Sequence, residues 1–259
     1  MSAPAPGLGD FSYLGPLFDA AAVHRADDHF VPPPEPAVGS SLAQDDEPLK
    51  SWGVANFVRS SLTAGLFHVE ALNKLVTVVR KVDPYSPWTL LRCVLENFAT
   101  AVWLLEGQTC DGRRHRALSL WDEDFRNRAQ HEADVHHVVT GPDEKTGEQR
   151  RQEVKQLADN LGLCPLSTPR AGEIIVTAAS TAGLDPEQTR ASWRVASGFA
   201  HGRFWPHLRA AEPTGVVSTP GGRLISFQVD DKQLESLATA CRTLLEHTAR
   251  QYASRSTPP

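Results

Sequence analysis

The sequence predicts an all-α protein, a single bundle of six or seven helices with one small β-hairpin before the last helix. From Trp52 onward, apolar residues recur every three or four positions, which is the spacing of an amphipathic helix. Helix-start signals such as Ser86-Pro87 and Asp185-Pro186 recur along the chain. Apolar and polar residues alternate in TGVVSTPGGRLISFQV around Pro220-Gly221-Gly222, which is typical of a hairpin.

The first three helices are long and carry clear apolar rows. The first begins near Val54 and ends before Asp83-Pro84. Ser86 suits the N-cap of the second and Pro87 its first turn, and almost every later position of this helix is apolar, so we expect it to be buried. The ranges expected for these helices are about 54–81, 87–105 and 113–139.

The later helices are marked mainly by their ends. Gly162 ends a polar helix, because glycine adopts the left-handed conformation that follows many helix termini. Asp185 is expected as an N-cap, with Gln188 completing a capping box, and Asp230 with Gln233 does the same for the last helix. The expected ranges are about 148–161, 168–180, 185–202 and 230–252.

The N-terminal region differs in composition from the rest. Residues 1–50 contain VPPPEP and QDDEP, so we expect a Pro/Ala-rich, loosely ordered N-terminal arm. Residues 51–259 are expected to form a single helical-bundle domain, and a chain of 259 residues is long enough to bury a substantial core.

Composition limits the classes of partner. The formal net charge of −5 gives no overall attraction to nucleic acid or to an anionic membrane, although a local basic patch is compatible with it. Four separated cysteines without a CxxC pair indicate reduced thiols. The N-terminal residues have neither a basic n-region nor an apolar h-region, so we expect no secretory signal. Residues 87–105 are apolar, but a charge in mid-membrane costs about 2.5–3.5 kcal/mol, and Arg92 and Glu96 lie there. We therefore expect a cytoplasmic protein with no membrane association.

Several kinds of site have no support in the sequence. There is no GxxxxGK[ST] or GxGxxG phosphate loop and no GxSxG nucleophile motif.

The third helix is dense in histidines and carboxylates, but two ligands on one helix are not a metal site, and salt bridges on a solvated face explain the pattern better. The residues concerned are His131, Glu132, Asp134, His136 and His137. We expect neither a metal nor a cofactor.

Arg92 and Glu96 are unusual because they interrupt an apolar helix. They lie one turn apart and can pair with each other, which would make them a structural ion pair. Alternatively, they form the floor of a polar pocket in which Arg92 binds an anion.

The segment RASWRVASGFAHGRFW combines polar and small residues on one helix. Arg194 and His201 are two turns apart, about 10 Å along the axis, and Ser197 lies between them. This places a fixed cation, a hydroxyl and an imidazole on one face. Gly198 and Gly202 weaken the helix and would admit a ligand or another backbone. The structural alternative is a tight helix crossing in which His201 binds a buried carbonyl.

Three segments together resemble a family of uncharacterised helical proteins common in actinobacteria. They are SPWTLLRCVLENFATAVWLLEG, RALSLWDEDFRNRAQHE and WRVASGFAHGRFW. More distantly, an arginine followed by a histidine in a late helix is similar to HEPN domains, many of which are metal-independent ribonucleases. The resemblance implies that Arg194 and His201 are an RNA-cleaving pair, usually completed across a dimer cleft.

The HEPN motif is an arginine, four to six residues, and then a histidine. Two other pairs in the sequence also fit it, Arg126 with His131 and Arg242 with His247, but only the Arg194 pair is set among small and aromatic residues.

Three functions follow from these patterns. In a HEPN-like ribonuclease or toxin-like defence protein, His201 is the general acid/base, Arg194 stabilises phosphate charge, and Ser197 and Arg203 position RNA, with a homodimer as the expected assembly. Alternatively, the chain is a non-catalytic bundle that binds a small anionic ligand or a protein through a polar pocket. That pocket would be lined by Arg92, Glu96, Arg194 and His201. A third possibility is a scaffold that dimerises through the glycine-bearing helix.

Overall fold

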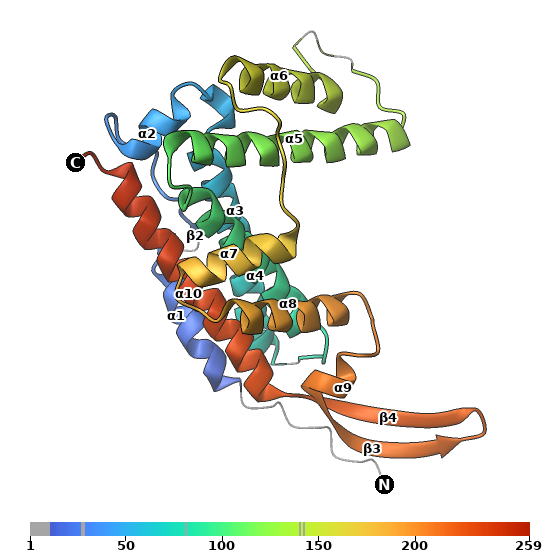
Figure 1. The fold of residues 1–259 in the computed structure, drawn as a ribbon. Coiled ribbons are helices and arrows are strands. Elements are labelled where there is room, and N and C mark those ends of the chain that lie inside the picture. Colours follow the sequence, from blue (N-terminus) through green and yellow to red (C-terminus); the bar gives the residue numbers. More distant parts are fainter. Residues whose placement is uncertain (1–10, 27–28, 81, 140, 142) are drawn as a thin grey trace. The chain divides into compact units, whose positions relative to one another are not determined.

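A computed structural model of the chain describes residues 11–26, 29–80, 82–139, 141 and 143–259 (Figure 1). Over these residues the chain is helical, with a long antiparallel hairpin late in the sequence, so the predicted all-α class is confirmed. Seven of the described helices have 11 or more residues, matching the upper end of the predicted number.

The described residues form ten α-helices and two antiparallel strand pairs. The helices are α1 Gly15–Ala22, α2 Ser41–Asp46, α3 Val54–Lys74, α4 Ser86–Leu105, α5 Cys110–Asp134, α6 Gly147–Asn160, α7 Ala171–Thr181, α8 Pro186–Ala200, α9 His207–Ala210 and α10 Asp231–Ser256. The strands are β1 Arg25–Ala26, β2 His29–Phe30, β3 Ala211–Thr219 and β4 Gly222–Val229. Strand β3 pairs with β4 in the predicted hairpin, whereas the short β1–β2 pair was not predicted.

The structure corrects several predicted helix ends. Helix α3 ends at Lys74 and is followed by a π-helical turn, Leu75–Val79, whereas the predicted end near residue 81 lies outside the described residues. Two other corrections have a clear local cause. The carboxylate of Asp83 accepts hydrogen bonds from the backbone N–H groups of Tyr85 and Ser86, at 2.8 and 2.9 Å. Asp83 therefore caps α4, and Ser86 is its first helical residue rather than its cap. Helix α5 ends at Asp134, before the predicted residue 139, because His136 has a left-handed φ of 50° that a helix cannot continue through.

The chain divides into two compact units. Unit 1 contains the described residues of Met1–Pro32, Ser61–Val102 and Ala171–Ala249. Unit 2 contains Pro33–Ser60, the described residues of Trp103–Arg170, and Arg250–Pro259. The predicted boundary at residue 50 stays a prediction.

The core of unit 1 is built around α4, as its apolar composition predicts. Trp88 and Phe98 are fully buried, and Trp88 stacks on Phe199 of α8 with ring centroids 5.0 Å apart. Gly65 of α3 lies against the Phe98 ring, where a Cβ would come within 2.3 Å. Burying each such large apolar side chain contributes about 1.5–3 kcal/mol, so these contacts hold α3, α4 and α8 together.

Unit 2 is centred on α5, which lies along α6 (Figure 1). Gly147 allows their close approach, because a Cβ there would lie 2.5 Å from the backbone nitrogen of Ala129. Thr146 and Gln149 form a capping box at the start of α6. Gly162 follows the end of α6 with a φ of 68°, as the sequence predicts.

The described part of the N-terminal arm carries α1 and α2. Leu14 in unit 1 and Leu42 in unit 2 are both fully buried. The hydroxyl of Ser40 accepts a hydrogen bond from the N–H of Ala43 and so caps α2. The arm therefore contains buried leucines beside its proline-rich segment.

Two segments of the described residues are long and apolar enough to cross a membrane by length and composition. They are Val54–Val79 and Ser86–Leu105, whose most apolar windows are 28% and 61% buried. The core helix of a soluble protein has the same composition as a membrane span. The expected cytoplasmic location and absence of membrane association stay predictions.

Candidate functional site

Helix α8 carries most of the candidate residues. Asp185 caps its first turn as predicted, but among the described residues Gln188 does not complete the predicted capping box. The Asp185 carboxylate accepts hydrogen bonds from the N–H groups of Glu187 and Gln188, at 2.9 and 3.0 Å. Pro186 occupies the first turn, where its missing N–H costs nothing.

Gly202 ends α8, as predicted. It has a left-handed φ of 62°, and its N–H donates to the carbonyl of Phe199 at 3.0 Å. The N–H of Arg203 donates to the carbonyl of Gly198 at 2.8 Å, which completes a Schellman motif. Glycine is favoured at this position because a Cβ strains left-handed backbone.

Gly198 has a packing role. A Cβ at this position would lie 2.5 Å from Cγ of Pro206 and 3.1 Å from Cζ2 of Trp205. The missing side chain therefore lets the chain's own Trp205-Pro206 segment lie directly on α8. The sequence predicted a close approach here but not which segment makes it.

Arg92 and Glu96 form the predicted ion pair in unit 1. The Nε of Arg92 donates to Oε1 of Glu96 at 2.9 Å, and the two side chains are 23% and 28% exposed. The indole Nε1 of Trp193 also donates to Oε1 of Glu96, at 2.7 Å. Sequence reasoning missed Trp193, although a half-buried indole N–H requires an acceptor. It is Trp193, beside Arg194, that joins α8 to this pair.

The Arg92–Glu96 pair also affects a neighbouring thiol. Burial raises the pKa of Cys93, and the charge of Glu96 raises it further. This cysteine is therefore a poor nucleophile near neutral pH.

The candidate catalytic residues lie on the open side of α8. Arg194, His201 and Arg203 are exposed, and Ser197 is half-buried. Among the residues that the structure describes, the side chains of Arg194 and His201 make no hydrogen bond or ion pair. The two groups are therefore available to a ligand, in contrast to Arg92 and Glu96.

An aromatic cluster follows α8. His207 of α9 is buried, its Nε2 lies 3.2 Å from the hydroxyl of Tyr85, and its ring meets Phe199 edge-on at 5.0 Å. The cluster packs α9 against Tyr85 and Phe199 within unit 1, while Phe204 and Trp205 remain 61% and 43% exposed. The open side of α8 thus adjoins exposed aromatic rings.

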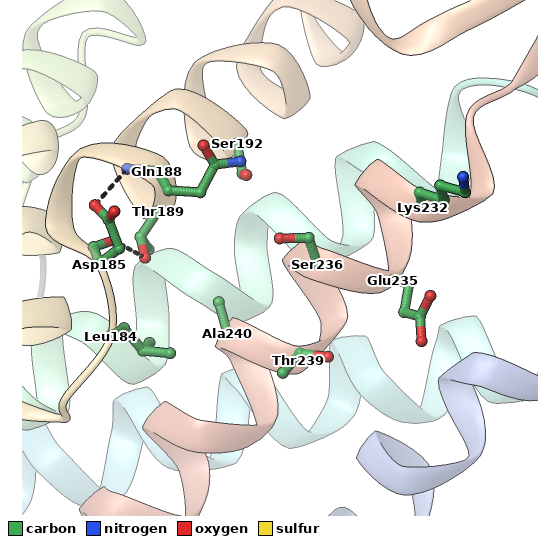
Figure 2. A pocket seen from close by; sticks show the side chains of 10 residues that line it. All are labelled: Leu184, Asp185, Gln188, Thr189, Ser192, Lys232, Glu235, Ser236, Thr239 and Ala240. Carbon is green, nitrogen blue, oxygen red and sulfur yellow. Dashed lines mark hydrogen bonds between the residues drawn. The ribbon is translucent and has the colours of Figure 1, made fainter.

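A separate pocket of about 320 Å³, lined mostly by polar residues, lies between the first half of α8 and the first half of α10 (Figure 2). Thr189 and Ser192 are its buried hydroxyl residues, and Thr189 donates to the carbonyl of Asp185 at 2.7 Å. The full lining is Leu184, Asp185, Gln188, Thr189, Ser192, Lys232, Glu235, Ser236, Thr239 and Ala240. This lining contains none of the predicted site residues, so the polar pocket predicted around Arg92 and Glu96 differs from this one.

The charged side chains of α5 form several ion pairs. Arg128 pairs with Glu132 at 2.6 Å, and Glu132 also accepts the N–H of Gly147 at 2.7 Å. His137 lies 3.1 Å from Glu144. In the part of the chain that the structure describes, no group of three or more His, Cys, Asp or Glu side chains could hold a metal ion.

Comparison of the chain with protein-family models, with curated proteins and with solved structures returned no match. The HEPN resemblance therefore rests on the spacing of Arg194 and His201 and on their helical context.

Proposed function

We propose that this protein is a HEPN-like, metal-independent ribonuclease of the defence or toxin type, with Arg194 and His201 as its catalytic pair. One observation carries the proposal. Both side chains are exposed on one face of α8 and bind no other described side chain, whereas Arg92 and Glu96 are occupied by each other and by Trp193.

The reaction needs two kinds of group. His201, as general base, takes the proton of a ribose 2′-hydroxyl, and that oxygen attacks the adjacent phosphorus. The bond from phosphorus to the 5′ oxygen breaks, and the leaving oxygen takes a proton from water or from the imidazole of a second copy of the chain. The guanidinium of Arg194 stabilises the charge on the phosphate oxygens. The products are a 2′,3′-cyclic phosphate and a 5′-hydroxyl.

Binding depends on local rather than overall charge, because the chain carries a net charge of −5. Arg203 and Arg209 are exposed in the segment after α8 and add cations near its C-terminal end. Ser197 can donate a hydrogen bond to a phosphate oxygen from the same helix. Since binding by such contacts releases counterions, affinity for RNA should fall with rising salt.

The test is cleavage of a single-stranded RNA in EDTA by the full-length chain. His201→Ala and Arg194→Ala should each reduce the rate about 100-fold or more. The controls are His131→Ala and Arg126→Ala, which remove the same residue types at a similar spacing on α5. These controls should cleave at the wild-type rate. Equal rates for wild type and His201→Ala, or no cleavage by the wild type, would refute the proposal.

A second candidate function is non-catalytic binding of a small polar ligand, and the α8–α10 pocket favours it (Figure 2). The pocket has one ammonium group, Lys232, and two carboxylates, Asp185 and Glu235, so it suits a zwitterion better than a small anion. Thermal unfolding with a panel of free amino acids tests this function. Stabilisation by one of them that is lost in Lys232→Met, but kept in the control Lys155→Met, would support it. The absence of any stabilisation would exclude these ligands.

A further inference from the structure

The ring of Trp205 packs on α8 at Gly198, near the open side of the helix. Gly198 lies four residues after Arg194 and three before His201, so the three positions share one face of the helix. The Trp205 ring lies on Gly198, with Cζ2 and Cε2 at 3.1 and 3.2 Å from the position that a Cβ would take. The indole therefore packs on α8 at Gly198, a position that lies between the two candidate catalytic residues along the sequence.

The ring is held there by its surroundings. Pro206, the next residue, also contacts α8 at Gly198, and the N–H of Arg203 is bonded to the Gly198 carbonyl. Although one part of the indole packs on the helix, 43% of Trp205 stays exposed. A large apolar ring is thus fixed at the surface beside an arginine and a histidine.

This arrangement supplies what an unpaired nucleotide requires. Bases stack on exposed aromatic rings, and each such contact contributes about 1–3 kcal/mol. The Arg194 guanidinium can bind a phosphate, and the His201 imidazole can accept a proton from a 2′-hydroxyl. Bases in a duplex are already stacked and paired, so they would not reach the ring.

We propose that Trp205 is the base-stacking residue of the RNA site and makes the enzyme select single-stranded RNA. An unpaired base lies on the exposed face of the indole while a phosphate of the same strand contacts Arg194. This inference rests on the proposed function, but it concerns binding rather than the chemical step.

The test measures affinity in the full-length His201→Ala background, which keeps the RNA intact. Binding of a fluorescein-labelled single-stranded 12-mer is followed by anisotropy. Trp205→Ala should weaken binding about 5- to 150-fold, the equivalent of one lost stacking contact. Trp205→Phe should keep most of the affinity. Leu208→Ala, which removes another exposed apolar side chain of the same region, should leave it unchanged.

A second measurement leaves the protein unaltered. Abasic sites are placed one at a time along the 12-mer, and one position should show the same loss of affinity as Trp205→Ala. That loss should be absent in the Trp205→Ala protein, and a duplex of the same sequence should bind weakly to both. Gly198→Ala, whose Cβ would displace the ring, should also weaken binding.

The outcomes separate this inference from the proposed function. Equal affinity of Trp205→Ala and its parent, together with His201-dependent cleavage by the wild type, would overturn the role of Trp205 and leave the ribonuclease standing. Trp205-dependent binding without cleavage would support the stacking site and refute catalysis. If the wild type binds no RNA, or if no abasic position matters, the inference fails.

Discussion

The buried Arg113–Asp45 pair of unit 2 and the open side of α8 in unit 1 each contain an arginine, but they use it in opposite ways. In unit 2, Asp45 is 0% and Arg113 is 4% exposed. Both Nε and Nη2 of Arg113 donate to the Asp45 carboxylate, the latter at 2.9 Å, and Nη1 donates to the carbonyl of Gly107 at 2.7 Å. In unit 1, Arg194 and His201 are exposed and bind no described side chain.

The difference shows how burial distinguishes charged side chains that stabilise the fold from charged side chains that can bind a ligand. A buried ion must be fully paired, since leaving it unpaired costs several kcal/mol, and its donors are then unavailable to a ligand. Exposed groups gain little from internal pairing and stay free to bind. The Arg92–Glu96 pair lies between these cases, because it is half-buried and takes its third partner from Trp193.

The largest expected effect breaks the buried pair. Asp45→Ala leaves the Arg113 guanidinium buried without its carboxylate and should lower the free energy of unfolding by about 3–5 kcal/mol. The control is Glu123→Ala, which removes the exposed partner of Arg126 and should cost less than about 1 kcal/mol. Urea unfolding of the two variants measures both values. A loss below 1 kcal/mol for Asp45→Ala would show that the pair is not structural.

A smaller effect should appear at the intermediate site. Trp193→Phe keeps most of the ring but removes the indole donor to Glu96, so it should cost about 1 kcal/mol. Trp205→Phe is the matched control, because the indole N–H of Trp205 donates to no described residue. Its unfolding free energy should equal that of the wild type. An equal loss of unfolding free energy in both variants would show that the hydrogen bond to Glu96 is not the cause.

A further effect concerns the pH dependence of unit 2. Burial raises the pKa of Asp46 to about 6, although its hydrogen bonds from the N–H groups of Ala55 and Val54 oppose the shift. The folded state therefore binds a proton between about pH 4 and 6 that the unfolded state has lost. The contribution of Asp46 to stability is full below about pH 4 and is lost as the pH rises through 6.

Asp46→Asn, which cannot titrate, isolates this contribution. The unfolding free energy of the wild type relative to Asp46→Asn should fall between pH 4 and 6 and then stay constant. The side-chain oxygen of asparagine can still accept hydrogen bonds from the N–H groups of Val54 and Ala55 at the start of α3. The comparison therefore measures the effect of protonating Asp46 rather than the loss of these hydrogen bonds. A difference that is constant across this range would contradict the raised pKa.

Much of the fold was predictable because local signals determine it. Capping residues such as Asp185 and terminating glycines such as Gly202 act within one turn, so they can be recognised in the sequence. The buried helix α4 was also predictable, since almost all its side chains are apolar.

What the sequence could not predict depends on contacts between distant residues. Asp45 and Arg113 are 68 residues apart, and nothing in either segment marks them as partners. Trp193 and Glu96 are 97 residues apart, so the third member of the Arg92–Glu96 cluster emerged only from the packing of α8 in unit 1. The segment that fills the space at Gly198 was likewise set by the turn after α8.

The most direct test of the central claim is to map where RNA binds. The full-length chain is irradiated with a single-stranded RNA containing 4-thiouridine, and crosslinked peptides are identified by mass spectrometry. The account predicts crosslinks within residues 190–210, at the open face of α8 and the Trp205 segment. Crosslinks confined to α5 and α6 of unit 2, or none at all, would contradict it.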